Sequence, residues 1–186
     1  MYIRTEETPN PETLKFIPGH DVSVGKSYAF DSADEALISP LAVSIFAIDT
    51  VEKVFLGADF ISITKKKDED WFLIKPEILS VIMEHYVTGQ PVVLNEKQDE
   101  DASDENDSKV VKEIKEVIHQ KVRPAVANDG GDIIFRNFDD ATGTVYLELQ
   151  GACSGCPSST VTLKNGVERL LSHYVPEVKA VEEFVN

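Results

Sequence analysis

Both cysteines of this 186-residue chain lie in one short stretch, GACSGCPSS, at residues 151–159. Cys153 and Cys156 form a CxxC pair, a spacing that metal sites and dithiol redox centres share. The pair falls between a predicted strand and a predicted helix, and Pro157 suits the first position of that helix. Cys156 would then be the N-cap, where unpaired backbone N–H groups and the helix dipole favour thiolate over thiol. We therefore expect these two residues to carry the chemistry of the chain.

Two thiolates are half of a usual metal site, because structural zinc takes four ligands and iron–sulfur clusters are usually held by four cysteines. Histidine does not complete the set. His173 lies on the helix that follows the pair, roughly 24 Å along its axis, and the others, His20, His85 and His119, fall in other predicted elements. Four thiolates are reached if two chains each supply Cys153 and Cys156. This predicts an iron–sulfur cluster shared across the two-fold axis of a homodimer.

Other uses of the pair stay open on the residues alone. A CxxC at a helix N-terminus is also the arrangement of thioredoxin-type dithiol-disulfide oxidoreductases. Two chains could share zinc through the same four sulfurs, and the thiols could be inert. A thioredoxin-type fold usually has its CxxC after the first strands of a larger sheet. Here a helix and a hairpin precede it within residues 109–186, which favours the shared iron–sulfur cluster.

The C-terminal residues, 109–186, predict the element order α-β-β-α-β. Apolar residues at helical spacing begin at Val110 and end at Val122, and Pro124 kinks or ends that helix. The strands IIFRNF and TVYLELQ flank the turn DDATG, and the strand VKAVEEFV follows the second helix. A β-α-β crossover makes the last strand parallel to its neighbour, so we expect a mixed three-stranded sheet. Gly166, inside the second helix, suggests close packing at that position.

The N-terminal residues, 1–94, predict a second small α+β domain. Strands are expected at LKFIPG, SYAF, VEKVFLG, DFISITK and DWFLI, with KKKDED as the hairpin turn between the last two. Ser39 is the expected N-cap of one helix, with proline at its first position. Pro76 is expected to open another helix, which Gly89 ends.

The segment NEKQDEDASDENDS, residues 95–108, separates the two domains. It has seven acidic residues, one lysine and no aliphatic residue larger than Ala102. Such a segment buries too little apolar area to offset its chain entropy, so we expect a disordered acidic linker. Residues 1–94 carry 8 Lys and Arg against 15 Asp and Glu, a net charge of −7.

The overall charge of −15 excludes several classes of partner. Nucleic acid and anionic membranes both need a basic surface, and no apolar run approaches the roughly 20 residues of a membrane span. The N-terminus shows neither a signal peptide nor an arginine-rich presequence, which predicts a cytoplasmic protein. No general base, Ser/His/Asp arrangement or phosphate loop is visible, so we do not expect an enzyme. DGGD, residues 129–132, could hold a cation, but a helix stop before a strand explains it better.

Two longer stretches of the C-terminal half, RPAVANDGGDIIF and LQGACSGCPSSTVTLKNGVERLLSHYVPEV, resemble the C-terminal domain of the NifU-like (Nfu) iron–sulfur cluster scaffold proteins. In the N-terminal half, TEETPNPETLKFIPG, SPLAVSIFAI and GQPVV resemble the Nfu N-terminal domain. The resemblance covers nearly the whole chain except residues 95–108. Together with the N-terminal residues, it favours a bacterial cytoplasmic protein over a mitochondrial matrix protein.

The resemblance implies a scaffold or carrier that accepts a [4Fe–4S] cluster and passes it to apo-proteins. It implies Cys153 and Cys156 as the ligands, with one cluster per homodimer; a [2Fe–2S] cluster would use the same four sulfurs. Upstream cluster-assembly proteins and apo iron–sulfur proteins would be the partners. A cluster held by two ligands per chain is open to an incoming client thiolate, so we expect ligand exchange and not redox turnover.

Overall fold

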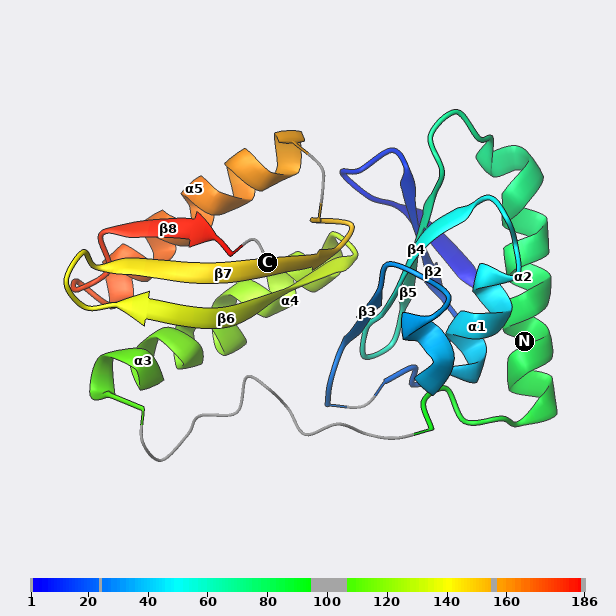
Figure 1. Ribbon diagram of the computed structural model, residues 1–186, viewed down its shortest axis with the longest axis horizontal. Coiled ribbons are helices and arrows are strands. Elements are labelled where there is room, and N and C mark those ends of the chain that lie inside the picture. Colours follow the sequence, from blue (N-terminus) through cyan, green and yellow to red (C-terminus); the bar gives the residue numbers. More distant parts are fainter. Residues whose placement is uncertain (1, 24, 95–106, 155–156, 185–186) are drawn as a thin grey trace. The chain divides into compact units, whose positions relative to one another are not determined.

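The structure is a computed structural model that describes residues 2–23, 25–94, 107–154 and 157–184 (Figure 1). The chain divides into two compact units, Met1–Gln98 and Asp99–Asn186. Both units combine helices with a sheet, which confirms the predicted α+β class. Among the described residues, no helix has the length and apolar character to cross a membrane.

The N-terminal unit contains a five-stranded antiparallel sheet in the order β1-β2-β5-β4-β3. A short 3-10 helix and two α-helices pack against it, and one hydrophobic core joins the sheet to both α-helices. The bounds of the strands are β1 Arg4–Glu7, β2 Thr13–Ile17, β3 Tyr28–Phe30, β4 Val51–Leu56 and β5 Ile61–Lys65. The helices are η1 Glu35–Ile38, α1 Pro40–Phe46 and α2 Trp71–Thr88.

Helix α1 begins as the sequence predicts. The Ser39 hydroxyl accepts a hydrogen bond from the Ala42 N–H at 3.1 Å and donates one to the Val92 carbonyl at 2.6 Å. Ser39 is completely buried, so the cap also ties the segment after α2 to the start of α1.

Helix α2 differs from the prediction, because it begins at Trp71 and not at Pro76. The expected strand DWFLI is wrong: Asp70 caps the helix, accepting from the Phe72 N–H at 2.9 Å. Ile74, Ile78 and Ile82 then face the core at helical spacing. Pro76 lies inside the helix, and the burial of this face outweighs the backbone hydrogen bond that proline removes. Gly89 ends α2 in the left-handed conformation (φ 68°), as predicted.

The C-terminal unit has a three-stranded sheet in the order β6-β7-β8, formed by Gly131–Asp139, Thr144–Gly151 and Ala180–Glu183. β6 and β7 are antiparallel and β7 and β8 are parallel, which confirms the mixed sheet. The first helical region consists of α3 Lys109–Val117, a π-helical turn η2 Ile118–Val122 and α4 Arg123–Asn128. The interruption precedes Pro124, as the kink prediction requires. Helix α5, Pro157–Tyr174, connects β7 to β8, and one core joins helices and sheet.

Most of the predicted linker, residues 95–106, lies outside the described part of the chain. Its last two residues belong to the fold of the C-terminal unit. The Ser108 hydroxyl accepts from the Val111 N–H at 3.2 Å and caps α3. Asp107 forms an ion pair with Lys115, with 2.8 Å between Oδ2 and Nζ.

Candidate metal centre

Cys153 lies in the turn that follows β7. Its side chain is 4% exposed and belongs to the hydrophobic core of the C-terminal unit. Cys156, the second predicted ligand, lies outside the described residues. The helix that follows the pair begins at Pro157, where the sequence predicts it. The structure therefore places one of the two predicted ligands, between the end of a strand and the start of a long helix.

The backbone before Cys153 is fixed against the start of β6. Gly151 and Gly131 are paired across the β6–β7 ladder. The Ala152 N–H donates to the Gly130 carbonyl, and the Ser154 N–H donates to the Gly151 carbonyl, both at 3.1 Å. Gly151 has a φ of 66°, a conformation that glycine adopts without strain. The turn that carries the cysteine is thus held by hydrogen bonds on both sides.

Gly131 leaves the space that the Cys153 sulfur occupies. A Cβ atom placed on Gly131 would lie 2.8 Å from Cys153 Sγ and 2.6 Å from the Gln150 carbonyl oxygen. Real Cβ atoms do not approach other atoms so closely, so a side chain here would displace the cysteine or the strand. The sequence predicts a helix stop at DGGD, or a cation site, but it does not reveal this contact.

The Asp132 carboxylate is paired with an arginine side chain of the same unit. Arg123 forms a bidentate pair with it, at 2.9 Å from Nε to Oδ1 and 2.7 Å from Nη2 to Oδ2. Asp132 is buried, and its Oδ1 also accepts from the Ile133 N–H at 2.8 Å. Gly130 has a φ of 82° and its N–H donates to the Ala127 carbonyl. DGGD is therefore a helix stop joined to a buried ion pair, and the cation-site reading is not supported.

No further ligand set accompanies Cys153 within the described residues, where no group of three or more His, Cys, Asp or Glu side chains could hold a metal ion. His173 lies in the last turn of α5, at the opposite end from the cysteine turn. His20 and His85 belong to the N-terminal unit and His119 to η2.

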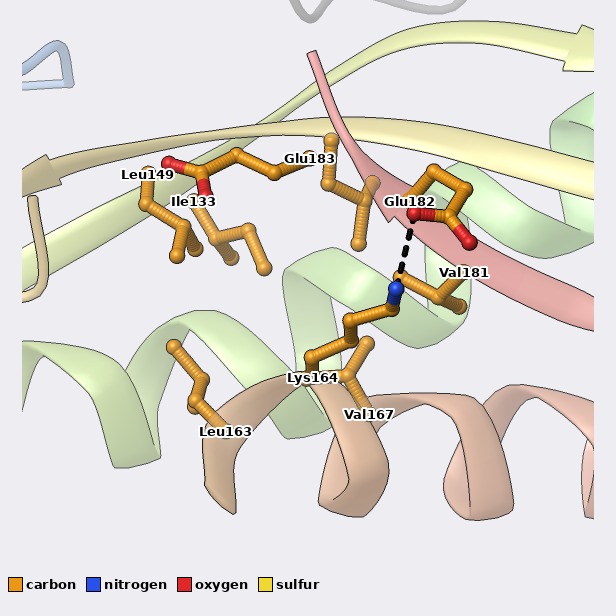
Figure 2. Close-up of a pocket in the computed structure, with 9 residues that line it drawn as sticks. Ile133, Leu149, Leu163, Lys164, Val167, Val181, Glu182 and Glu183 are labelled. Atoms are coloured by element: carbon orange, nitrogen blue, oxygen red, sulfur yellow. Dashed lines mark hydrogen bonds and ion pairs between the residues drawn. The ribbon is translucent and has the colours of Figure 1, made fainter. Parts of the chain in front are cut away.

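A small apolar cavity lies between the sheet and α5 (Figure 2). Its volume is about 20 Å³, room for one water molecule. Leu149, Leu163 and Val181 are among its lining residues, and the Lys164–Glu182 ion pair closes one side at 2.7 Å. This cavity is a packing gap and not a site for a cluster.

The chain is similar to known proteins over both of its units. The family described as "Scaffold protein Nfu/NifU N terminal" matches residues 3–89, and the "NifU-like domain" matches residues 114–182. NifU-like protein 5, mitochondrial, of Arabidopsis thaliana is 49% identical over 98% of this chain and 68% of its own length. The human NFU1 iron-sulfur cluster scaffold homolog, mitochondrial, is 46% identical over 100% of this chain and 73% of its own length. The solution structure of a Saccharomyces cerevisiae NifU-like protein is 34% identical, covers 52% of this chain and 87% of that one, and has a TM-score of 0.46.

The expected location in the cell is wrong. The bacterial cytoplasm was expected from the N-terminal residues, but the Arabidopsis, human and Drosophila relatives are all named mitochondrial. The names of the relatives point to a mitochondrial location, so the inference from the N-terminal residues fails.

The expectation of a non-enzyme agrees with these relatives, because the human relative is named a scaffold. Both halves of the chain match the two domains of one family, in the order in which the sequence predicts them. The chain therefore belongs to the Nfu/NifU family of iron–sulfur cluster scaffold proteins.

Proposed function

We propose that this protein carries a [4Fe–4S] cluster between two copies of the chain and delivers it to apo iron–sulfur proteins. Cys153 and Cys156 of each copy are the four ligands. The observation that carries the proposal is the setting of Cys153, whose sulfur fills a space that only glycine at position 131 leaves open. Mitochondrial apo-proteins are the clients that the relatives' names support.

The shortage of ligands supports sharing between chains. A [4Fe–4S] cluster is usually held by four thiolates, and the sequence has two cysteines. The described residues offer no cluster of His, Cys, Asp or Glu to take the place of the missing pair. A second copy on a two-fold axis supplies two equivalent thiolates. A [2Fe–2S] cluster would have the same ligands.

The position of Cys153 suits a ligand of an iron–sulfur cluster. The side chain is almost completely shielded from water, and the turn that carries it is fixed to the start of β6. The N-terminus of α5, which begins at Pro157, favours negative charge nearby. The helix N-terminus offsets the cost of burying a thiolate in apolar surroundings, and the fixed turn holds the sulfur in place.

Delivery follows from the same arrangement. Cys153 lies in a turn outside the regular strands and helices, so exchange of its sulfur for a client thiolate does not require the sheet or helices of the C-terminal unit to unfold. An incoming client thiolate replaces one ligand at a time, and the iron changes partners without a net redox reaction. The N-terminal unit takes no part in ligation.

Anaerobic reconstitution with iron and sulfide tests the proposal. The wild-type chain should give a brown protein with four irons per two chains, and the cluster should transfer to an apo-acceptor. Cys153→Ala and Cys156→Ala should each abolish iron binding and cluster-dependent dimerisation while the protein still folds. His173→Ala, a change on the same helix far from the turn, is the matched control and should load normally.

The same preparation separates the rival functions. A dithiol oxidoreductase would form an internal disulfide with reductase activity and bind no iron. A zinc-stapled dimer would contain zinc by elemental analysis and transfer nothing. Full iron content in either cysteine variant would contradict the ligand assignment.

A further inference from the structure

A groove in the N-terminal unit contains neither of the predicted cluster ligands. Its volume is about 580 Å³, and it lies between edge strand β1, the turn after it, and the first residues of α2. We call it the β1 groove. Its lining includes Thr5 and Glu7 of β1, the turn residues 8–11, and Trp71, Phe72 and Lys75 of α2.

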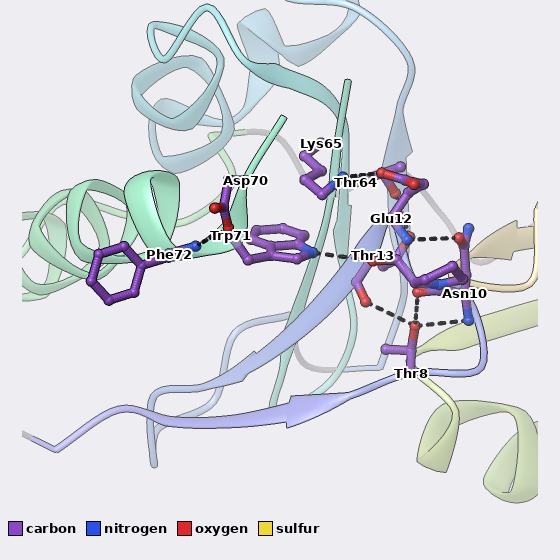
Figure 3. A network of polar contacts seen from close by, with 10 residues as sticks. Thr8, Asn10, Glu12, Thr13, Thr64, Lys65, Asp70, Trp71 and Phe72 are labelled. Atoms are coloured by element: carbon purple, nitrogen blue, oxygen red, sulfur yellow. Dashed lines mark hydrogen bonds and ion pairs between the residues drawn. The ribbon is translucent and has the colours of Figure 1, made fainter. Parts of the chain in front are cut away.

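A rigid turn forms one end of the β1 groove (Figure 3). The Thr8 hydroxyl lies 2.9 Å from the carbonyl oxygens of Asn10 and Thr13 and accepts from the Asn10 N–H at 3.2 Å. The Asn10 side chain accepts from the Glu12 N–H at 3.0 Å, and the Trp71 indole N–H donates to the Pro11 carbonyl at 3.2 Å. These bonds fix the turn to the start of α2. A preformed wall lowers the entropy cost of binding a ligand.

Strand β1 forms the side of the groove and is an edge of the sheet. Within the described residues it pairs only with β2, in the register Arg4↔Ile17 to Glu7↔Leu14. Alternate residues of such a strand direct backbone N–H and C=O groups away from the sheet. An extended peptide can pair with these groups, while the neighbouring groove receives its side chains.

Two aromatic side chains give the groove an apolar surface. Trp71 is half-buried beside the turn, with its ring 6.4 Å from that of Phe16 in the core. Phe72 is 82% exposed, so it contributes almost nothing to the fold. Exposed large aromatic side chains beside a groove are typical of protein interfaces.

The charge of the N-terminal unit favours a basic ligand for the β1 groove. Residues 1–94 have a net charge of −7. The groove itself is lined by one acidic and one basic residue, Glu7 on β1 and Lys75 on α2, and Glu7 is exposed with no ion-pair partner among the described residues. The acidic segment 95–108, with a net charge of −6, is repelled by this unit. A basic partner is attracted by the same field.

We propose that the β1 groove binds an extended basic segment of a partner protein, which adds to β1 as a further strand and places apolar side chains against Phe72. Backbone pairing provides the affinity, and Glu7 with the acidic unit around it selects lysine and arginine. Cluster ligation is not needed for this binding.

Trp71 makes the test specific, because it is the only tryptophan of the chain and lines the groove. The full-length protein without iron is titrated with a nonapeptide that alternates lysine and valine, and the Trp71 emission is measured. We expect a saturable change that weakens as salt increases. The same peptide with N-methylated backbone amides keeps its charge but cannot pair as a strand, so it should not saturate. A peptide with glutamate in place of lysine should not bind.

Two neighbouring exposed residues provide matched variants. Phe72→Ala should weaken binding about tenfold, whereas Leu73→Ala should leave it unchanged, since Leu73 is 73% exposed but does not line the groove. Far-UV circular dichroism of both variants should match the wild type. The proposal is overturned by an unchanged Trp71 emission, by equal effects of the two substitutions, or by equal binding of the N-methylated peptide. Because no iron is used, these results leave the ligand assignment untouched.

Discussion

Gly131 and Cys153 are in contact across the end of the β6–β7 ladder. A Cβ on Gly131 would be 2.8 Å from the Cys153 sulfur and 3.2 Å from its Cβ. The two residues are 22 positions apart, one in DGGD and one in the CxxC pair. The position of the sulfur therefore depends on a residue that carries no chemistry of its own.

We expect Gly131→Ala to lower both the stability and the iron content of the protein. The added methyl group overpacks the turn, which costs roughly 1–3 kcal/mol, and moves Cys153 from its position. Thermal unfolding by circular dichroism and iron content after reconstitution are the two measurements.

Gly166→Ala is the control, because a Cβ there meets nothing within 4 Å. It should load iron normally and, by improving helix propensity, gain up to about 1 kcal/mol of stability. Normal iron content in Gly131→Ala would show that the contact does not position the ligand.

Arg123→Met should be the most destabilising single change in the C-terminal unit outside the apolar core. It leaves the Asp132 carboxylate, with 9% of its side chain exposed, without the bidentate partner, at a cost of about 3–5 kcal/mol. Lys164→Met breaks the more exposed pair with Glu182 and should cost less than about 1 kcal/mol. Equal unfolding temperatures for the two variants would contradict the claim that the buried pair contributes more to stability than the exposed one.

His85 makes the stability of the N-terminal unit dependent on pH. Burial lowers the pKa of His85 below 6.5, partly opposed by a backbone hydrogen bond with Gln90, and its Nε2 is buried without a hydrogen-bond partner in the described structure. The unfolded chain thus takes up a proton at a higher pH than the folded one. The free energy of unfolding should decrease as the pH drops below about 6.5. It should continue to decrease until the pH reaches the pKa of His85 in the folded protein.

Urea unfolding followed by Trp71 emission between pH 7.5 and 5 measures this effect. His85→Gln should remove most of the pH dependence of the urea midpoint. His173→Gln changes an exposed residue of the other unit and should leave that dependence unchanged. A wild-type midpoint that does not change over this range would contradict the role of His85.

The predicted acidic linker should affect cluster transfer and not cluster binding. Deletion within residues 96–105 changes how far one unit reaches from the other, so we expect altered transfer rates with full iron content. A deletion extended through Asp107 and Ser108 should also destabilise the C-terminal unit, and Ser108→Ala alone should cost about 1 kcal/mol. Identical transfer rates across a series of linker lengths would remove this role.

Local signals predicted much of the fold. Ser39 as an N-cap, Gly89 as a helix end and the hairpin of β6 and β7 are each set by residues close in sequence. The start of α2 was missed because Pro76 suggests a helix start, while the actual cap, Asp70, lies in a run of charged residues that resembles a turn. Gly166 was expected to be closely packed, but its surroundings are open.

The sequence predicts Cys153 and Cys156 as the ligands, but it does not predict what surrounds Cys153. The contact of Gly131 with Cys153 and the Arg123–Asp132 pair join residues through tertiary structure. Likewise, the short strand β1 shows little alternation, with the sequence RTEE, and forms only because β2 offers it a partner. Long-range packing of this kind leaves no periodic signal in a sequence.

The central claim is that one cluster belongs to two chains. Native mass spectrometry of the anaerobically reconstituted full-length protein tests it most directly, since it counts chains and metal ions in the same particle. We predict a species of two chains with four irons and four sulfides, which splits into single chains when the cluster is removed. A single chain that carries all four irons would contradict the account.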